Sequence, residues 1–400
     1  MKIAQRALQI CPSLTLELTA RAKQLKSEGM DVVSFGAGEP DFNTPDYILD
    51  AAKEALDNGV TKYTPASGTN ELKQVICNKF LRDNGLEYFP SNIVVSNGAK
   101  HSLTNVCQAI VEEGDEVIIP APYWLTYPEL VRLSGGVPVI VNTKEENGFK
   151  MTAEELKNAI TPKTKAVILN NPNNPTGAVY SKEEIYALAE VIEKTDIVVI
   201  SDEIYEELNY TGEKVTSIAT YSHKLKEQTI IVNGVSKTYA MTGWRIGFIA
   251  APNPVAKAIA NMQSHTTSNP NSIAQYATVA AYTHDGGTQF LKDMTQSFAR
   301  RRKLIMDELN KIEQISYVRP DGAFYVLVNV SNVFGKRYDG TYVSTAHEFA
   351  NLLLEKALVT VIPCESFAAP EYVRLSYAIS DEDIKKGVGR IGAFVRAMEN

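Results

Sequence analysis

Short apolar runs recur along the middle of the chain, and helical patterns separate most of them. Runs of this length, bounded by turn residues, are typical of buried strands, whereas apolar residues three or four positions apart indicate helices. The alternation predicts an α/β/α sandwich around a mostly parallel seven-stranded sheet. The strands are expected near residues 93, 117, 138, 166, 197, 229 and 246.

The two ends of the chain carry a different pattern. Residues 13–29 have helical spacing and residues 32–35 indicate a short strand, while residues 290–312 predict a long amphipathic helix. Further on we expect strands at 322–328, 359–362 and 372–377 and a helix at 346–356. We therefore predict three parts: an N-terminal segment, 1–45, packed with the small domain; a large domain, 46–288; and a smaller α+β domain, 289–400.

Two local features refine this outline. The helical region at 255–282 is expected to break at Pro270, because proline cannot continue a helix. The basic run at residues 300–303 is expected to be a solvated helix face with no role in binding nucleic acid.

Composition narrows the class of protein. The chain has 400 residues and a formal net charge of -7, which argues against a nucleic-acid partner. No run of 18 apolar residues occurs, so no membrane association is expected. Four scattered cysteines, with no CxxC pair, indicate reduced core thiols and no metal site, and they favour a cytoplasmic location (Cys11, Cys77, Cys107 and Cys364).

Candidate chemistry centres on Lys237, which lies between two apolar runs, 229–232 and 246–250. A partly desolvated amine loses proton affinity, becomes nucleophilic and can form a Schiff base with an aldehyde cofactor. Arg245, eight residues further on, offers a planar cation suited to a phosphate. Position alone does not decide the matter, because most lysines beside strands are solvated.

A resemblance to a known family supports this role for Lys237. Ser236-Lys237, the later Gly243-Trp244-Arg245 and the run Asn-Asn-Pro-Asn-Asn-Pro-Thr-Gly at 170–177 resemble the active-site signature of class I pyridoxal-phosphate aminotransferases of the aspartate aminotransferase family. The likeness extends in order from Gly36 to Arg374. It implies fold type I of the pyridoxal-phosphate enzymes, pyridoxal 5'-phosphate as cofactor, and a homodimer with active sites shared across its interface.

The cofactor residues combine physical argument with the resemblance. A strand, a glycine turn and a helix N-terminus make an anion site at Gly98, and a carboxylate just past a strand, Asp202, needs a partner. The alternative for Asp202 is a helix N-cap. For Trp124, whose flat face suits stacking on a ring, the alternative is a core aromatic. By resemblance the cofactor is bound by Gly98, Ala99, Lys100, Trp124, Asn174, Asp202, Tyr205, Ser236, Lys237 and Arg245, and by Tyr63 of the other subunit.

The candidate substrate-binding residues also rest on a physical argument together with the resemblance. Period-two alternation along 372–377 turns Arg374 toward a cleft, where a guanidinium can bind an α-carboxylate bidentately, although an exposed strand arginine is the alternative. Lys100 opposes the dipole of its helix, which invites a functional reason, but it could also be a solvated lysine. By resemblance the substrate is bound by Gly38, Trp124, Asn174, Arg374, Lys100 and Thr15.

Two departures from the family pattern bear on the substrate. Gly234 stands where many members have a phosphate-binding serine, and the distal-carboxylate arginine of some aspartate aminotransferases has no clear counterpart. Lys100, with Thr15 as a helper, resembles the branch that acts on aspartate and, in some members, prephenate.

The resemblance predicts an enzyme that converts L-aspartate and 2-oxoglutarate to oxaloacetate and L-glutamate. The alternatives are a prephenate or aromatic amino-acid aminotransferase, a pyridoxal-phosphate C-S lyase, and a cofactor-sensing regulatory module without turnover. Such modules carry a helix-turn-helix domain, which the chain shows no sign of.

Overall fold

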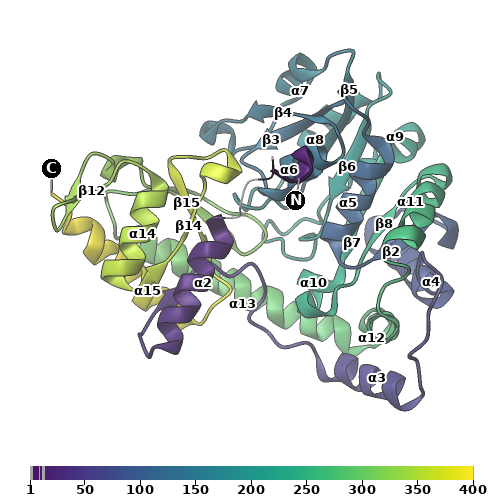
Figure 1. The fold of residues 1–400 in the computed structure, drawn as a ribbon, viewed down its shortest axis with the longest axis horizontal. Helices are drawn as coiled ribbons and strands as arrows, with labels where there is room; N and C mark the ends of the chain where they lie inside the picture. Colours follow the sequence, from purple (N-terminus) through teal and green to yellow (C-terminus); the bar gives the residue numbers. More distant parts are fainter. Residues whose placement is uncertain (1–2, 9, 11–13, 400) are drawn as a thin grey trace.

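A seven-stranded sheet forms the centre of the larger part of the molecule (Figure 1). The computed structural model describes residues 3–8, 10 and 14–399. Neighbouring strands from β4 to β7 pair in parallel, and β8 runs antiparallel to both β7 and β2. The predicted, mostly parallel sheet is therefore confirmed. In spatial order its strands are β2 (Ile93–Ser96), β8 (Gly247–Ala250), β7 (Thr229–Gly234), β6 (Val198–Asp202), β5 (Thr164–Asn170), β3 (Glu116–Ala121) and β4 (Val137–Asn142).

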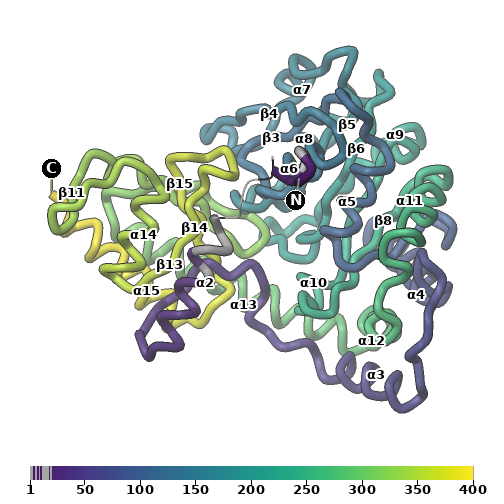
Figure 2. Tube along the Cα trace, viewed as in Figure 1, coloured from purple at the N-terminus to yellow at the C-terminus, as the bar shows by residue number. Residues whose placement is uncertain are grey.

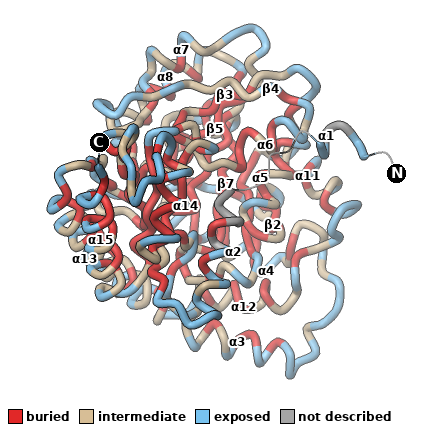
Figure 3. The backbone as a smooth tube through the Cα atoms, turned by 60° about the vertical axis from the view of Figure 1, so that its left-hand side comes forward, coloured by how far each residue is buried: buried red, intermediate tan, exposed pale blue. Residues whose placement is uncertain are grey.

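Helices cover both faces of this sheet because successive strand residues point to opposite sides. On β7, Ile230 and Val232 pack into one apolar cluster, and Ile231 packs into another on the opposite face. The first face carries α5 (Ala99–Ile110), α6 (Thr126–Leu133) and α11 (Asn253–Thr266). The second carries α3 (Asp46–Asp57), α4 (Asn70–Lys79), α7 (Ala153–Ala159), α8 (Lys182–Ile192), α9 (His223–Gln228) and α12 (Ser272–Thr283). Figure 3 shows the buried residues concentrated along the strands between these layers.

A smaller antiparallel sheet lies in the C-terminal part. Its order is β14 (Ile362–Pro363), β15 (Tyr372–Ser376), β10 (Tyr325–Asn329) and β9 (Ser316–Val318). The single strand expected at 359–362 is wrong in detail, because β13 (Val359–Thr360) pairs with another element. The remaining elements are α1 (Gln5–Leu8), α2 (Leu14–Ser27), α10 (Val235–Thr238), α13 (Gly286–Leu309), α14 (Ala346–Ala357), α15 (Asp381–Arg396), β11 (Arg337–Tyr338) and β12 (Thr341–Tyr342).

The N-terminal segment joins this smaller part. Strand β1 (Val33–Ser34) pairs in parallel with β13, and α2 lies beside β14 (Figures 1 and 2). Helix α13 begins beneath the larger part and extends into the smaller one (Figure 1). The boundaries at 45 and 288 stay a prediction.

The expected break in the helical region near Pro270 is confirmed. Helix α11 ends at Thr266 and α12 begins at Ser272, where the side chain of Asn271 accepts a hydrogen bond from the backbone N–H of Ala274 at 2.9 Å. An asparagine N-cap satisfies one of the unpaired amides of the new helix.

The basic run on α13 is not the solvated face that its charge predicts. Arg302 is buried and lies 2.7 Å from the Asp321 carboxylate, and Arg301 lies 2.6 Å from that of Asp41. Only Arg300 and Lys303 of the run are exposed. Arginine stems pack along apolar surface while the guanidinium pairs with an acid, and a charge count alone does not reveal this.

Two further features concern thiols and membranes. Cys77, Cys107 and Cys364 are free and buried, and Cys11 lies outside the described residues. Within residues 3–8, 10 and 14–399, none of the helices combines the length and the apolar character needed to cross a bilayer.

The aromatic contacts of Phe298 give a prediction for stability. Phe298 is fully buried on α13, with its ring centroid 5.5 Å from those of both Phe42 and Phe324. Replacing it by alanine leaves a cavity, so we expect Phe298→Ala to destabilise the fold by about 3–5 kcal/mol. Phe89, whose exposed fraction is 62%, is the matched control, and Phe89→Ala should change stability by less than about 1 kcal/mol. Equal shifts of the urea unfolding midpoint would contradict this packing argument.

Candidate active site

A cavity of about 800 Å³ opens at the carboxyl ends of the central strands and is bounded on its other side by β10 and β15 of the smaller sheet. Ligands of open α/β sheets bind in this position. The structure brings most of the predicted residues together here. Those that line the cavity are Gly38, Ala99, Lys100, Trp124, Asn174, Asp202, Tyr205, Ser236, Lys237, Arg245 and Arg374.

Lys237 lies on the short helix α10, which follows β7 directly and holds the amine at the cavity. Its Nζ donates a hydrogen bond to the backbone carbonyl of Gly38. Burial lowers the pKa of Lys237 to about 8; Arg374 and Arg245 act in the same direction, and Glu39 opposes them. An amine with this pKa is neutral often enough near neutral pH to act as nucleophile and base.

Asp202 ends strand β6 and is only 3% exposed. Its Oδ2 accepts a hydrogen bond from the Tyr127 hydroxyl at 2.7 Å, and its Oδ1 accepts one from the backbone N–H of Ile204 at 3.2 Å. Burial raises the pKa of Asp202 to about 6, and these two hydrogen bonds limit the rise. A turn follows Asp202, so the helix N-cap alternative is wrong.

Arg374 and Asn174 form a buried pair at the cavity. Arg374 Nη1 donates to Asn174 Oδ1 at 2.9 Å, and the guanidinium carbon lies 4.3 Å from the centre of the Tyr325 ring. Arg374 Nε is buried without a hydrogen-bond partner. The neighbours Val373 and Leu375 pack into the core, as strand alternation predicts, so the exposed-arginine alternative is wrong. The unpaired donor suits a carboxylate ligand.

An anion cradle lies at the start of α5. Gly98, with φ 87°, precedes this helix, and a Cβ there would lie 2.3 Å from Arg245 Nη2. A Cβ on Gly247 would lie 2.1 Å from the backbone nitrogen of Ala99. Only glycines let the arginine and strand β8 approach the helix N-terminus so closely, and N–H groups and a guanidinium together suit a phosphate.

Lys100 and Trp124 form a second cationic corner of the cavity. The Lys100 ammonium lies 4.8 Å from the centre of the Trp124 ring, and Trp124 packs edge-on against Tyr127. The Trp124 ring is half-buried and also contacts two apolar clusters, so it serves the core and the cavity together. Lys100 is exposed yet lines the cavity.

The structure does not place two of the predicted residues at the cavity. Tyr63 is 89% exposed and lines a separate surface hollow with residues 267–272. Thr15 falls within α2, but its side chain lies outside the described residues. One chain alone therefore does not bring Tyr63 to the cavity.

Among the cavity residues that the sequence analysis did not assign, three make side-chain hydrogen bonds that shape the site. Tyr127 bonds Asp202, Tyr325 bonds the Tyr205 hydroxyl at 3.0 Å, and Glu39 accepts a hydrogen bond from Thr242 at 2.5 Å. The signal for Tyr127 was its position one helical turn after Trp124, and that for Glu39 was its place next to Gly38. Tyr325 carried no signal, because its strand looks like ordinary core.

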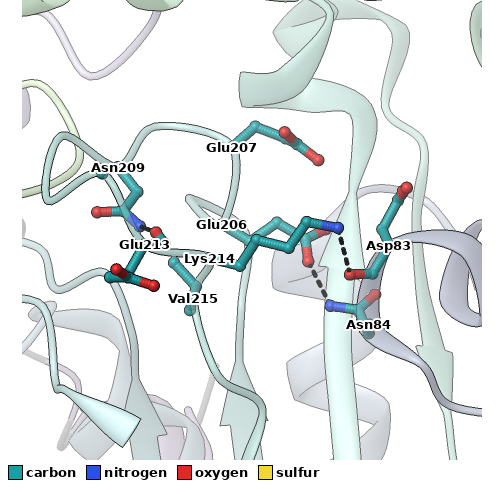
Figure 4. A pocket seen from close by; sticks show the side chains of 9 residues that line it. Asp83, Asn84, Glu206, Glu207, Asn209, Glu213, Lys214 and Val215 are labelled. Atoms are coloured by element: carbon teal, nitrogen blue, oxygen red, sulfur yellow. Dashed lines mark hydrogen bonds between the residues drawn. The ribbon is translucent and has the colours of Figure 1, made fainter.

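A second hollow, of about 350 Å³, contains none of the predicted residues. Carboxylates dominate it, with Lys214 reaching across toward the Asp83 backbone (Figure 4). Burial, together with the neighbouring Glu206, raises the pKa of Glu207 to about 7. Within the part of the chain that is described, no group of three or more His, Cys, Asp or Glu residues is placed to hold a metal ion.

The fold and the cavity define the class of protein. The family model for aminotransferase class I and II matches residues 30–391, and the chain belongs to this family, which uses pyridoxal phosphate. The residues present fit that cofactor: an amine of lowered pKa, a buried carboxylate for a ring nitrogen and a glycine-lined cradle for a phosphate.

Individual relatives cover the whole chain. Over 397 residues it is 50% identical to an aspartate aminotransferase of Geobacillus stearothermophilus, covering 99% of this chain and 100% of the relative. It is 46% identical to a probable aspartate/prephenate aminotransferase of Aquifex aeolicus, covering 97% of each. A solved aspartate aminotransferase from Thermus thermophilus with maleate has a TM-score of 0.93 at 42% identity, covering 98% of this chain and 100% of that one.

The Tyr127–Asp202 bond predicts a pKa change. Tyr127→Phe removes a donor to the ionised carboxylate, so the pKa of Asp202 in the cofactor-free protein should rise by about 1 from its value of about 6. The pKa can be followed by 13C NMR of aspartate-labelled protein, with Asp202→Asn assigning the signal. Tyr180→Phe, which alters another buried tyrosine whose oxygen accepts from Met151, is the matched control and should leave the signal unchanged. An identical pKa in both variants would contradict the proposed coupling.

Glu207 predicts a pH dependence of stability. Its pKa in the folded chain, about 7, lies above its ordinary value of 4.5, so folding favours the protonated form. Its contribution is therefore complete below about pH 4.5 and is lost as the pH rises through 7. Glu207→Gln should stabilise the protein at pH 8, by an amount on the order of 1 kcal/mol after solvent screening, and have little effect at pH 5. Urea unfolding at the two pH values tests this, and an equal effect at both would refute it.

Proposed function

We propose that the protein transfers the amino group of L-aspartate to 2-oxoglutarate, forming oxaloacetate and L-glutamate, with pyridoxal 5'-phosphate as cofactor. The observation that carries this proposal is a single cavity lined by Lys237 and by three further cations, Lys100, Arg245 and Arg374. Arg245 belongs to the anion cradle, which leaves Lys100 and Arg374 for the substrate. A substrate with two carboxylates needs two such partners, and Arg374 has an unpaired donor ready for one. Relatives named as aspartate aminotransferases, one of them solved with the dicarboxylate maleate, support the same substrate class.

The side chains of the cavity have separate tasks in this reaction. When bound, pyridoxal phosphate supplies an aldehyde that takes up the amino group and a ring that accepts the electrons left at Cα. Arg374, held by Asn174 and the Tyr325 ring, binds the α-carboxylate and so fixes the orientation of Cα. Gly38 adds a backbone contact to the same carboxylate.

Lys237 moves the proton. Its lowered pKa leaves a neutral amine available to take the proton from Cα of the amino acid. Asp202, whose ionised form is stabilised by hydrogen bonds from Tyr127 and the Ile204 amide, would pair with a protonated ring nitrogen of the cofactor and stabilise its charge. Tyr205 and Asn174 would hold the 3'-oxygen of the ring by hydrogen bonds, and Trp124 would hold the ring by stacking.

The cradle holds the phosphate. Gly98, Ala99, Ser236 and Arg245 would hold it from one chain, and Tyr63 would reach it from a second copy, which leaves Lys100 for the distal carboxylate of the substrate. We therefore propose a homodimer with two shared sites. Buried free thiols at Cys77, Cys107 and Cys364 favour a reducing compartment and hence the cytoplasm.

Prephenate is the second candidate substrate. The Aquifex aeolicus relative is named for both aspartate and prephenate, and prephenate also carries a second carboxylate that Lys100 can pair with. An aromatic amino acid without that carboxylate would gain nothing from Lys100.

Half-reaction rates test the substrate assignment. Stopped-flow absorbance of the bound cofactor would compare aspartate, glutamate, phenylalanine and cystathionine, with prephenate as amino acceptor in the reverse half-reaction. We expect aspartate and glutamate to react fastest, and Lys100→Ser to slow both by about 10- to 100-fold while leaving phenylalanine unchanged.

The exposed Lys157, on α7, provides the matched control, and Lys157→Ser should have no effect. If phenylalanine is fastest and Lys100→Ser changes nothing, the dicarboxylate assignment fails. If Lys237→Ala retains the half-reaction, the assigned role of this lysine fails.

A further inference from the structure

An exposed tyrosine sits on a tightly held backbone. Tyr63 is 89% exposed, yet residues on both sides of it are bonded to the body of the molecule: Ser272 donates to the Val60 carbonyl at 2.9 Å, and a buried glutamine bonds Thr64. We propose that two buried glutamines, Gln263 and Gln275, are positioning residues that hold Tyr63 for the cofactor site of a second copy of this chain. The inference rests on the dimer of the proposed function.

Gln275 forms hydrogen bonds at two points of the Tyr63 segment, which we define as residues 60–69. This residue of α12 has no exposed surface. Its Nε2 donates to Thr64 Oγ1 at 3.0 Å and to the Pro270 carbonyl at 2.9 Å, and its Oε1 accepts from the Thr69 N–H at 2.9 Å. Both donors of the amide and its oxygen are used, so the side chain has one well-defined orientation. The Tyr63 segment is thereby tied to the break between α11 and α12.

Gln263 connects the same segment to the phosphate cradle. It is also fully buried, and its Nε2 donates to the carbonyls of Ala66, at 2.5 Å, and Val95, at 2.7 Å. Its Oε1 accepts from Ser96 Oγ at 2.7 Å and from Asn105 Nδ2 at 2.9 Å. Ser96 ends β2, two residues before Gly98, and Asn105 lies on α5. One amide therefore fixes both the Tyr63 segment and the approach to the chain's own cradle.

The surface beside Tyr63 continues to the cradle. The hollow of about 640 Å³ lined by residues 61–63 and 267–272 shares Asn271 with a neighbouring hollow of about 610 Å³. That second hollow is lined by Asn97 and by Arg245, which also lines the active-site cavity. A surface that carries both an outward tyrosine and an open edge of the cradle suits a twofold contact, in which each copy gives its Tyr63 and receives its partner's.

A rigid backbone matters for such a contact. A residue that must reach across an interface loses affinity if its segment has to be ordered on binding, and buried amides remove that cost in advance. Two apolar residues in place of the glutamines would fill the same space without setting the register of residues 64–69. The two glutamines thus act on the site through Tyr63 and not by touching the ligand.

Mixed dimers separate this role from a local structural one. Two differently tagged chains are co-expressed, and Lys237→Ala in one of them leaves one lysine-bearing site per dimer. In the first dimer Gln275→Leu is in the chain that keeps Lys237. In the second, Gln275→Leu is in the Lys237→Ala chain, which supplies Tyr63 to the remaining lysine-bearing site.

The readout is the cofactor retained at Lys237 after dilution, fixed by borohydride and measured by peptide mass spectrometry. We expect the second dimer to retain cofactor about 10-fold more weakly than a reference dimer with native Gln275, and the first to match the reference. Tyr63→Phe should follow the same pattern. Thr64→Val removes the hydrogen bond from Gln275 to Thr64 and leaves no cavity in the core. In the second arrangement it should cause a smaller loss of retained cofactor.

Gln228 provides the matched control. Its side-chain amide donates to the backbone carbonyls of Thr195 and Ile197, which do not belong to the Tyr63 segment. Gln228→Leu should cause no loss in either arrangement. Equal weakening in both mixed dimers, or weakening in the first alone, would overturn the positioning role while leaving the dimer intact. A monomer in light scattering would overturn the inference together with the dimer, and normal half-reaction rates in that monomer would leave the transaminase assignment standing.

Discussion

The burial of ionisable groups at the carboxyl ends of the parallel strands is the constraint on which the rest of the site depends. Asp202 and Arg374 are buried, and Lys237 is half-buried. A buried charge is costly unless it is paired, so each must find its partner within one cavity. The hydrogen bonds from Tyr127 to Asp202 and from Arg374 to Asn174, and the contact of Lys237 with the Gly38 carbonyl, are the consequence. The burial that costs free energy of folding also lowers the pKa of Lys237 and makes its amine reactive.

Backbone proximity is the second condition. Strand β8 runs antiparallel to β7 and passes so close to the start of α5 that no side chain fits at Gly247. Gly98 imposes the same limit on the guanidinium of Arg245. The antiparallel strand in a mostly parallel sheet thus turns Arg245 back toward the helix N-terminus. Sheet topology and glycine placement together build an anion site that neither would build alone.

How well a feature could be predicted depends on how far apart in the sequence the interacting residues lie. Strand and helix positions depend on local periodicity, and all seven predicted runs entered one sheet. The cavity residues were found because the motif around Lys237 and the asparagine–proline run resemble the signature of the family, and because both lie beside strand ends. Tyr127 and Tyr325 were missed because their partners, Asp202 and Tyr205, lie 75 and 120 residues away along the chain. The buried state of Arg302 was missed for the same reason, since its acid, Asp321, lies beyond the end of α13, in the loop between β9 and β10.

The glutamines show why buried polar residues resist prediction and why they matter. In sequence, Gln263 and Gln275 are single polar positions on the apolar faces of two helices, and a pattern of apolar spacing treats them as exceptions. In space, Gln263 bonds the Tyr63 segment and the end of β2 at once, so the position of the outward tyrosine and the position of the cradle cannot vary independently. The proposed site, completed by two chains, needs that dependence, because each chain has to present Tyr63 to its partner in the same frame in which it presents its own anion cradle.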